Sequence, residues 1–195
     1  LTTISAQAKD GKTATLTAAM AATMTTNPDA DCLGWKSSNP DGKAVVHFDT
    51  EQSIEDHYAV GKRATDRAGL ATAPPWFVSY CLTGFTVREA RKAITVVLED
   101  EAKTHGGIHS VFLDGSADFV CDVNDPAESN EFVSSMHANG IEYRCPILAA
   151  IHLNPNSGTK TRGHLGSQLE RKAESNLKLE REGDIITLFA TRNRK

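Results

Sequence analysis

The hydrophobic and polar positions of this chain follow two alternating patterns, which predict strands and helices in turn. Short, nearly continuous apolar runs are typical of strands covered on both faces of a sheet. Longer stretches with apolar residues three and four positions apart are typical of helices with one buried side. Strands are expected at Leu1–Ile4, Ala44–Asp49, Trp76–Cys81, Ile108–Asp114 and Ile147–His152. Helices are expected at Ala14–Thr25, Ser53–Gly69, Thr86–Thr104, Glu128–Asn139 and Ser167–Ser175.

The end of the chain departs from this alternation with two consecutive strands. Leu177–Arg181 and Ile185–Thr191 are separated by Glu182-Gly183-Asp184, which is typical of a hairpin turn. Strands that alternate with helices predict an α/β fold with a mostly parallel central sheet flanked by helices. We therefore expect a single domain over residues 1–195, with a C-terminal antiparallel hairpin at one edge of its sheet.

Composition narrows the class of protein. With 195 residues, of which 39% are hydrophobic and 24% charged, the chain is long enough for one substantial core. No apolar run approaches the roughly 20 residues of a membrane helix and no secretory signal opens the chain, so we expect a cytoplasmic protein with no membrane partner. Leu1 already lies in the first expected strand, so we expect that any natural N-terminal extension lies outside this sequence. The four cysteines form no C-x-x-C pair, and the net charge of −4 does not by itself indicate nucleic-acid binding.

The most informative motif follows the first expected strand. The segment Ala6-Gln7-Ala8-Lys9-Asp10-Gly11-Lys12-Thr13 is a Walker A phosphate loop with alanine where the first glycine usually stands. In such a loop, backbone N–H groups and the positive end of the following helix form a concave site for phosphates. Lys12 is then expected to reach the β- and γ-phosphates, and the Thr13 hydroxyl to coordinate Mg²⁺. The expected nucleotide-contacting residues are Ala6, Gln7, Ala8, Lys9, Asp10, Gly11, Lys12, Thr13 and Ala14.

Polar side chains stand at the ends of three other expected strands. In a parallel sheet, ligands bind beyond the carboxyl ends of the strands, so these side chains are expected to converge. Asp114 follows Val111-Phe112-Leu113, an arrangement in which the acid holds the water shell of Mg²⁺. Asp49 and Glu51 lie on the same side of an extended segment, and His152 ends another strand. Taken singly, such an Asp is more often a turn former and such a His a structural residue, but their order behind the phosphate loop favours a nucleotide site.

These segments together resemble the RecA-fold P-loop ATPases, a group that includes recombinases, DnaB-type hexameric helicases and the RepA-type helicases of plasmids and phages. The resemblance spans the chain, from the phosphate loop through 47–51 and 111–114 to 150–154 and 190–194. It implies a RecA-like P-loop NTPase core that uses ATP and Mg²⁺ at the subunit interfaces of a homo-oligomeric ring or filament.

The resemblance also implies roles for single residues. Glu51 matches the glutamate that orients and activates the attacking water, and His152 matches the polar residue that senses the γ-phosphate. Arg192 and Arg194 match a basic pair that reaches the ATP of the neighbouring subunit, where an arginine neutralises charge on the γ-phosphoryl group. A basic terminus on an exposed strand end is the alternative explanation of the two arginines, and the functional one is favoured because an arginine supplied in trans strongly accelerates phosphoryl transfer.

The loop 155–165 is the candidate contact for nucleic acid. It starts soon after His152, and in RecA-like proteins the corresponding loop lines the central channel and contacts single-stranded DNA. Lys160, Arg162 and His164 could pair with phosphates, although the loop lacks aromatic residues for base stacking and a plain solvated loop is the alternative. The acidic loop 114–131 is expected to repel DNA.

Two functions of different classes fit these observations. The first is an ATP-hydrolysing motor that moves or remodels nucleic acid, such as a DNA helicase. The second is a nucleotide-gated regulatory assembly similar to KaiC, which acts through protein partners. A small-molecule kinase is a third and less favoured option, because no substrate lid can be located in the sequence.

Overall fold

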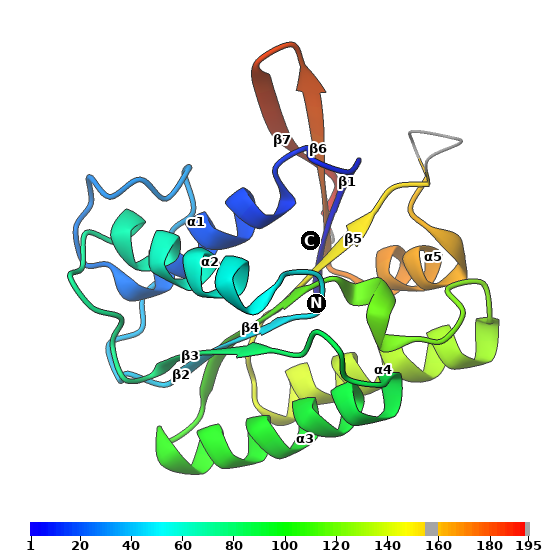
Figure 1. Cartoon of the computed structure of the whole chain (residues 1–195), viewed down its shortest axis with the longest axis horizontal. Coiled ribbons are helices and arrows are strands. Elements are labelled where there is room, and N and C mark those ends of the chain that lie inside the picture. Colours follow the sequence, from blue (N-terminus) through cyan, green and yellow to red (C-terminus); the bar gives the residue numbers. More distant parts are fainter. Residues whose placement is uncertain (155–159, 194–195) are drawn as a thin grey trace.

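The fold is built around a seven-stranded sheet (Figure 1), seen here in a computed structural model that describes residues 1–154 and 160–193. The strand order is β3-β2-β4-β5-β1-β6-β7, and every neighbouring pair is parallel except β6 and β7. The strands are β1 (Thr2–Ala6), β2 (Ala44–Asp49), β3 (Phe77–Cys81), β4 (Ile108–Asp114), β5 (Ile147–His152), β6 (Ser175–Glu182) and β7 (Ile185–Asn193). The predicted mostly parallel α/β sheet with a C-terminal antiparallel hairpin is thereby confirmed.

Helices cover both faces of the sheet. They are α1 (Lys12–Met24), α2 (Ile54–Arg67), α3 (Val87–Thr104), α4 (Pro126–Glu142) and α5 (Gly163–Lys172), with a short 3₁₀ turn, η1 (Ser116–Phe119). Helices α1 and α2 lie on one face, and α3, α4 and α5 on the other (Figure 1). In the part of the chain that the structure describes, no helix has the length and apolar character needed to cross a membrane.

The last helix differs from its predicted bounds. It begins at Gly163 rather than at Ser167, and the following strand begins at Ser175, where the helix was expected to end. The earlier start buries Leu165 together with Leu169, one helical turn further on, against the core. Gly163 has a φ of 66° and its backbone crowds Val123 so closely that only a glycine fits there without displacement.

Strand periodicity decides which polar residues face which helices. Successive side chains of a strand point to opposite faces, and in β4 Phe112 packs with α1 and α2 whereas Leu113 packs with α3 and α4. Asp114, two residues after Phe112, therefore lies on the α1 side of the sheet. The same parity brings Asp49 at the end of β2 and His152 at the end of β5 to that side, beyond the carboxyl edge of the parallel strands.

Candidate functional site

The loop between β1 and α1 lies at this edge of the sheet. Ala6 is the last residue of β1 and is paired with His152, so the position where a glycine was expected is an ordinary strand end. The left-handed residues come later, at Lys9 with a φ of 68° and at Gly11 with a φ of 83°. Alternation of left- and right-handed residues turns consecutive N–H groups toward a common centre, which is a favourable arrangement for an anion.

Helix α1 leaves its first N–H groups available. Its N-cap is Gly11, no described side chain caps it, and its first turn contains no acidic residue. Helices α2, α3 and α4 instead begin at Ser53, Thr86 and Asp125, each of which accepts hydrogen bonds from the first turn. The N–H groups and the positive end of α1 therefore remain open to an external anion.

The β6–β7 hairpin braces the same loop. Arg181 Nε lies 3.2 Å from Asp10 Oδ1, and Arg181 Nη2 donates to the carbonyl oxygen of Lys9 at 3.0 Å. A Cβ added to Gly11 would lie 3.1 Å from Ile186 Cδ1 on β7. The hairpin, which projects beyond the rest of the sheet in Figure 1, thus extends far enough to contact the loop.

Lys12 is a buried cation at the start of α1. Its Nζ lies 3.1 Å from both ring nitrogens of His152, and the residue is 6% exposed. Burial lowers the pKa of Lys12, while the nearby carboxylates of Glu51, Asp114 and Asp10 oppose that change. A cation that has lost most of its water in this way interacts strongly with an anion placed beside it.

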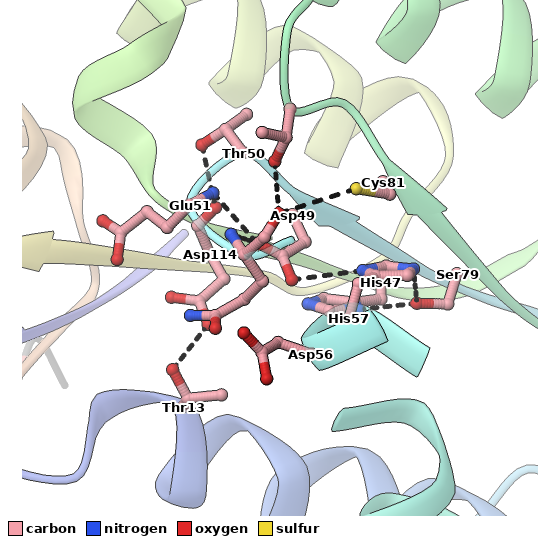
Figure 2. Close-up of polar contacts among 12 residues, drawn as sticks. Thr13, His47, Asp49, Thr50, Glu51, Asp56, His57, Ser79, Cys81 and Asp114 are labelled. Atoms are coloured by element: carbon pink, nitrogen blue, oxygen red, sulfur yellow. Dashed lines mark hydrogen bonds and ion pairs between the residues drawn. The ribbon is translucent and has the colours of Figure 1, made fainter. Parts of the chain in front are cut away.

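Asp114 is a buried acid with one oxygen left over. Thr13 Oγ1 donates to its Oδ2 at 2.8 Å (Figure 2). Its Oδ1 is buried and has no hydrogen-bond partner within residues 1–154 and 160–193. Burial raises the pKa of Asp114 to about 6, partly offset by the hydrogen bond from Thr13.

Thr13 and Asp114 fit Mg²⁺ better than a metal that needs a full protein cage. Mg²⁺ takes hard oxygen ligands and keeps several waters, so a hydroxyl, one carboxylate and a ligand's phosphate oxygens are sufficient. The unpaired Asp114 oxygen would accept a hydrogen bond from a metal-bound water. Among the described residues, no group of three or more His, Cys, Asp and Glu side chains is arranged to hold a metal ion.

Glu51 lies in the turn after β2 and faces His152. Its Oε1 is 3.3 Å from His152 Nε2, and its side chain is 25% exposed. The hydrogen bond from His152 and the charge of Lys12 hold the pKa of Glu51 below its ordinary value, although burial opposes this. With a proton on Nε2, the His152 ring donates to Glu51 while its Nδ1 accepts from Lys12.

The remaining predicted site residues lie outside this cluster. Arg192 pairs with Asn176 at the amino edge of the sheet, the opposite end from the β1–α1 loop, and Arg194 falls outside the described residues. Lys160, Arg162 and His164 are exposed, and residues 155–159 of the same loop also fall outside the described part. The described ends of this loop are tied to β5, because Arg162 N–H donates to the carbonyl oxygen of His152 at 3.1 Å and Asn154 N–H to that of Lys160 at 2.7 Å.

The sequence pattern places Asp49 beside Glu51 but does not indicate that Asp49 and His57 support the Glu51 turn. Asp49 Oδ1 accepts from the backbone N–H groups of Glu51 and Gln52, and its Oδ2 lies 3.1 Å from His57 Nδ1 on α2. The available signal was weak, namely a second buried acid at a strand end and a histidine eight residues later.

The structure thus brings Lys12, Thr13, Glu51, Asp114 and His152 together at one edge of the sheet. Comparison with known proteins adds no family to this geometry, since no family model and no curated protein matches the chain. The chemistry of the site has to be inferred from its residues.

Proposed function

We propose that this chain is a RecA-fold P-loop ATPase that hydrolyses ATP with Mg²⁺ and uses the cycle to act on nucleic acid. The observation that carries the proposal is the Asp114 carboxylate, buried beside Thr13 and Lys12, with an oxygen for which the described chain has no hydrogen-bond partner. A buried acid left in this state is destabilising unless a ligand completes it. The open N-terminus of α1 and the buried charge of Lys12 support the same ligand, a polyphosphate with its cation.

Each residue has a task that its position supports. Residues 6–14 hold the phosphates through backbone N–H groups, and Lys12 exchanges its hydrogen bond to His152 for one to a phosphate oxygen. Thr13 and Asp114 would hold Mg²⁺, which when bound would neutralise charge on the phosphate oxygens. Glu51 takes a proton from the attacking water as the new bond to the γ-phosphorus forms and the bond to the ADP oxygen breaks.

His152 is well placed to report the state of the γ-phosphate. Its ring contacts both Lys12 and Glu51, which are the two groups that a γ-phosphate and its attacking water would engage. Its carbonyl oxygen accepts from Arg162 at the start of α5. A shift of His152 would therefore move the loop that carries Lys160, Arg162 and His164.

The assembly and the partner complete the proposal. We propose that copies of the chain form a ring or filament in which Arg192 and Arg194 of one copy reach the ATP of the next. The position of Arg192 at the amino edge supports action on a neighbouring site rather than on its own. Single-stranded DNA is the proposed partner of the 160–164 segment.

Glu51→Gln tests the catalytic assignment. The amide keeps the shape of the side chain but cannot accept the proton, so turnover should fall by about 100-fold or more while ATP binding persists. Glu55→Gln, in the first turn of α2 and exposed, is the matched control and should retain full turnover. Undiminished hydrolysis by Glu51→Gln would overturn the assignment of the base.

The nucleic-acid assignment has its own test. Steady-state ATP hydrolysis at low salt should rise when single-stranded DNA is added, and Lys160→Ala combined with Arg162→Ala should remove the rise. Lys103→Ala on α3 removes an exposed cation elsewhere and should leave it intact. An ATP hydrolysis rate that DNA does not change in any variant would instead favour the regulatory assembly that acts through protein partners.

A further inference from the structure

A row of hydrogen-bonded polar side chains starts next to the Glu51 turn and joins β2, α2 and β3 (Figure 2). Asp49 Oδ2 lies 3.1 Å from His57 Nδ1, and His57 Nε2 lies 3.1 Å from Ser79 Oγ. Ser79 Oγ in turn lies 2.8 Å from His47 Nδ1. The two imidazole rings are stacked, with centroids 5.6 Å apart and an angle of 5° between their planes.

One assignment of protons satisfies the whole row. His47 Nδ1–H donates to Ser79, the Ser79 hydroxyl donates to His57 Nε2, and His57 Nδ1–H donates to Asp49. In this assignment His47 Nε2 carries no proton, and this buried nitrogen has no hydrogen-bond partner in the described chain. Burial also lowers the pKa of His47 to about 4, so this ring is neutral near pH 7.

The row ends on the backbone that carries Glu51. Asp49 Oδ1 accepts from Glu51 N–H at 3.0 Å and from Gln52 N–H at 3.1 Å. Asp49 is fully buried, so these bonds fix the turn in a single arrangement. The direction of the Glu51 side chain therefore depends on where His57 holds Asp49.

The order of hydroxyl, imidazole and carboxylate is also that of a serine-hydrolase triad. Here Ser79 lies in the middle of β3 rather than on a sharp turn, and its Oγ is shared between two imidazoles. The other carboxylate oxygen, Asp49 Oδ1, accepts hydrogen bonds from the backbone of the Glu51 turn. The geometry favours support of Glu51 over a separate hydrolytic centre.

We propose that His57 is a positioning residue for Glu51 and acts through Asp49. The proposal rests on the proposed role of Glu51 as the base of ATP hydrolysis. Loss of the His57 Nδ1–H donor lets Asp49 rotate, releases the two backbone N–H groups and misplaces the Glu51 carboxylate. Because the phosphate loop is not part of this row, turnover should suffer and nucleotide binding should not.

Two substitutions separate this role from a general packing role. Asn at position 57 can place its amide N–H where Nδ1–H stands, whereas Gln places its amide near Nε2 and leaves Asp49 without the donor. His57→Gln should lower kcat for ATP by about tenfold or more with KM unchanged, and His57→Asn should stay within about threefold of the unmodified protein. His105→Gln makes the same substitution at a histidine that contacts Glu101 on the other face of the sheet, away from Glu51, and serves as the control.

A readout that needs no hydrolysis distinguishes failure of this proposal from failure of the ATPase assignment. Hydrogen exchange of the Glu51 and Gln52 amides, measured on the whole protein, should speed up in His57→Gln and remain slow in His57→Asn and His105→Gln. Equal exchange in both His57 variants, or equal losses of kcat, would overturn the positioning role. The unmodified protein could fail to hydrolyse ATP while the variants still differ in amide exchange as predicted. That result would overturn the ATPase assignment but would support the role of His57 in holding Asp49.

Discussion

Asp49 and Asp114 end adjacent strands, face each other in register and are both 0% exposed, yet their surroundings differ completely. Asp49 uses both oxygens, accepting two backbone N–H groups and the His57 ring. Asp114 accepts from Thr13 with one oxygen, and the described residues provide nothing for the other. Two equally buried aspartates therefore differ in function: Asp49 has hydrogen-bond partners for both oxygens, whereas Asp114 has one oxygen without a partner among the described residues.

The pKa of each acid is shifted in the opposite direction, which follows from this difference in partners. Burial raises the pKa of both groups, but at Asp49 the hydrogen bonds from His57, Gln52 and Glu51, together with nearby His47, outweigh it and the pKa is lowered. At Asp114 burial dominates and the pKa reaches about 6. Buried acids with an unpaired oxygen are found mostly at functional sites, because a bound ligand there supplies the missing partner of the carboxylate.

Truncation of each aspartate to alanine should give the greatest difference in stability between the two positions. Asp49→Ala leaves three donors without their acceptor, namely the N–H groups of Glu51 and Gln52 and the buried His57 ring, and should lower the free energy of unfolding by about 3 kcal/mol or more. Asp114→Ala removes an uncompensated buried carboxylate and should leave stability at pH 7 unchanged or higher. Urea unfolding without nucleotide or Mg²⁺ measures both, and equal losses in the two variants would contradict the contrast.

The pH dependence of stability should also distinguish Asp114 from Asp49. The raised pKa of Asp114 means that, between pH 4 and 6, the folded protein holds a proton that the unfolded chain has lost. This contribution therefore stabilises the protein at low pH and is lost as pH rises to about 6, by about 3 kcal/mol in all. Stability relative to Asp114→Ala should fall over that range in chelator-treated protein, and a flat difference would count against the buried charge.

A smaller effect is expected at the hairpin brace. Arg181 is half exposed and its pairing with Asp10 is at the surface, so Arg181→Ala should change the free energy of unfolding by less than about 1 kcal/mol. Because Arg181 also holds the Lys9 carbonyl, the loop loses some order and ATP affinity should fall a few-fold. Titration calorimetry with Mg-ATP provides the check, and an unchanged affinity would mean that the loop keeps its shape without the hairpin.

The residues that meet at the carboxyl edge of the sheet could be predicted from the sequence, because strand periodicity is a local property. Asp114, His152 and Lys12 follow from apolar strands and a loop motif, and parity places their side chains on one face of a parallel sheet. The predicted α/β sheet and its terminal hairpin rest on the same local signals.

The supports of the site were not predictable in this way. His57 reaches Asp49 only because α2 has a particular rotation against β2, and Ser79 only because β3 pairs with β2 in a particular register. The start of α5 depends on how Gly163 packs on Val123, a contact across 40 residues. Such features come from tertiary packing, which no periodicity in one segment encodes.

Asp114, Thr13 and Lys12 are proposed to form a site for Mg-nucleotide. Equilibrium binding of ATP to the Glu51→Gln protein, with Mg²⁺ and with chelator, tests it without interference from turnover. We expect saturable binding that weakens about tenfold or more without Mg²⁺ and is lost when Lys12→Ala is added. Absence of binding, or binding indifferent to both Mg²⁺ and Lys12, would contradict the account.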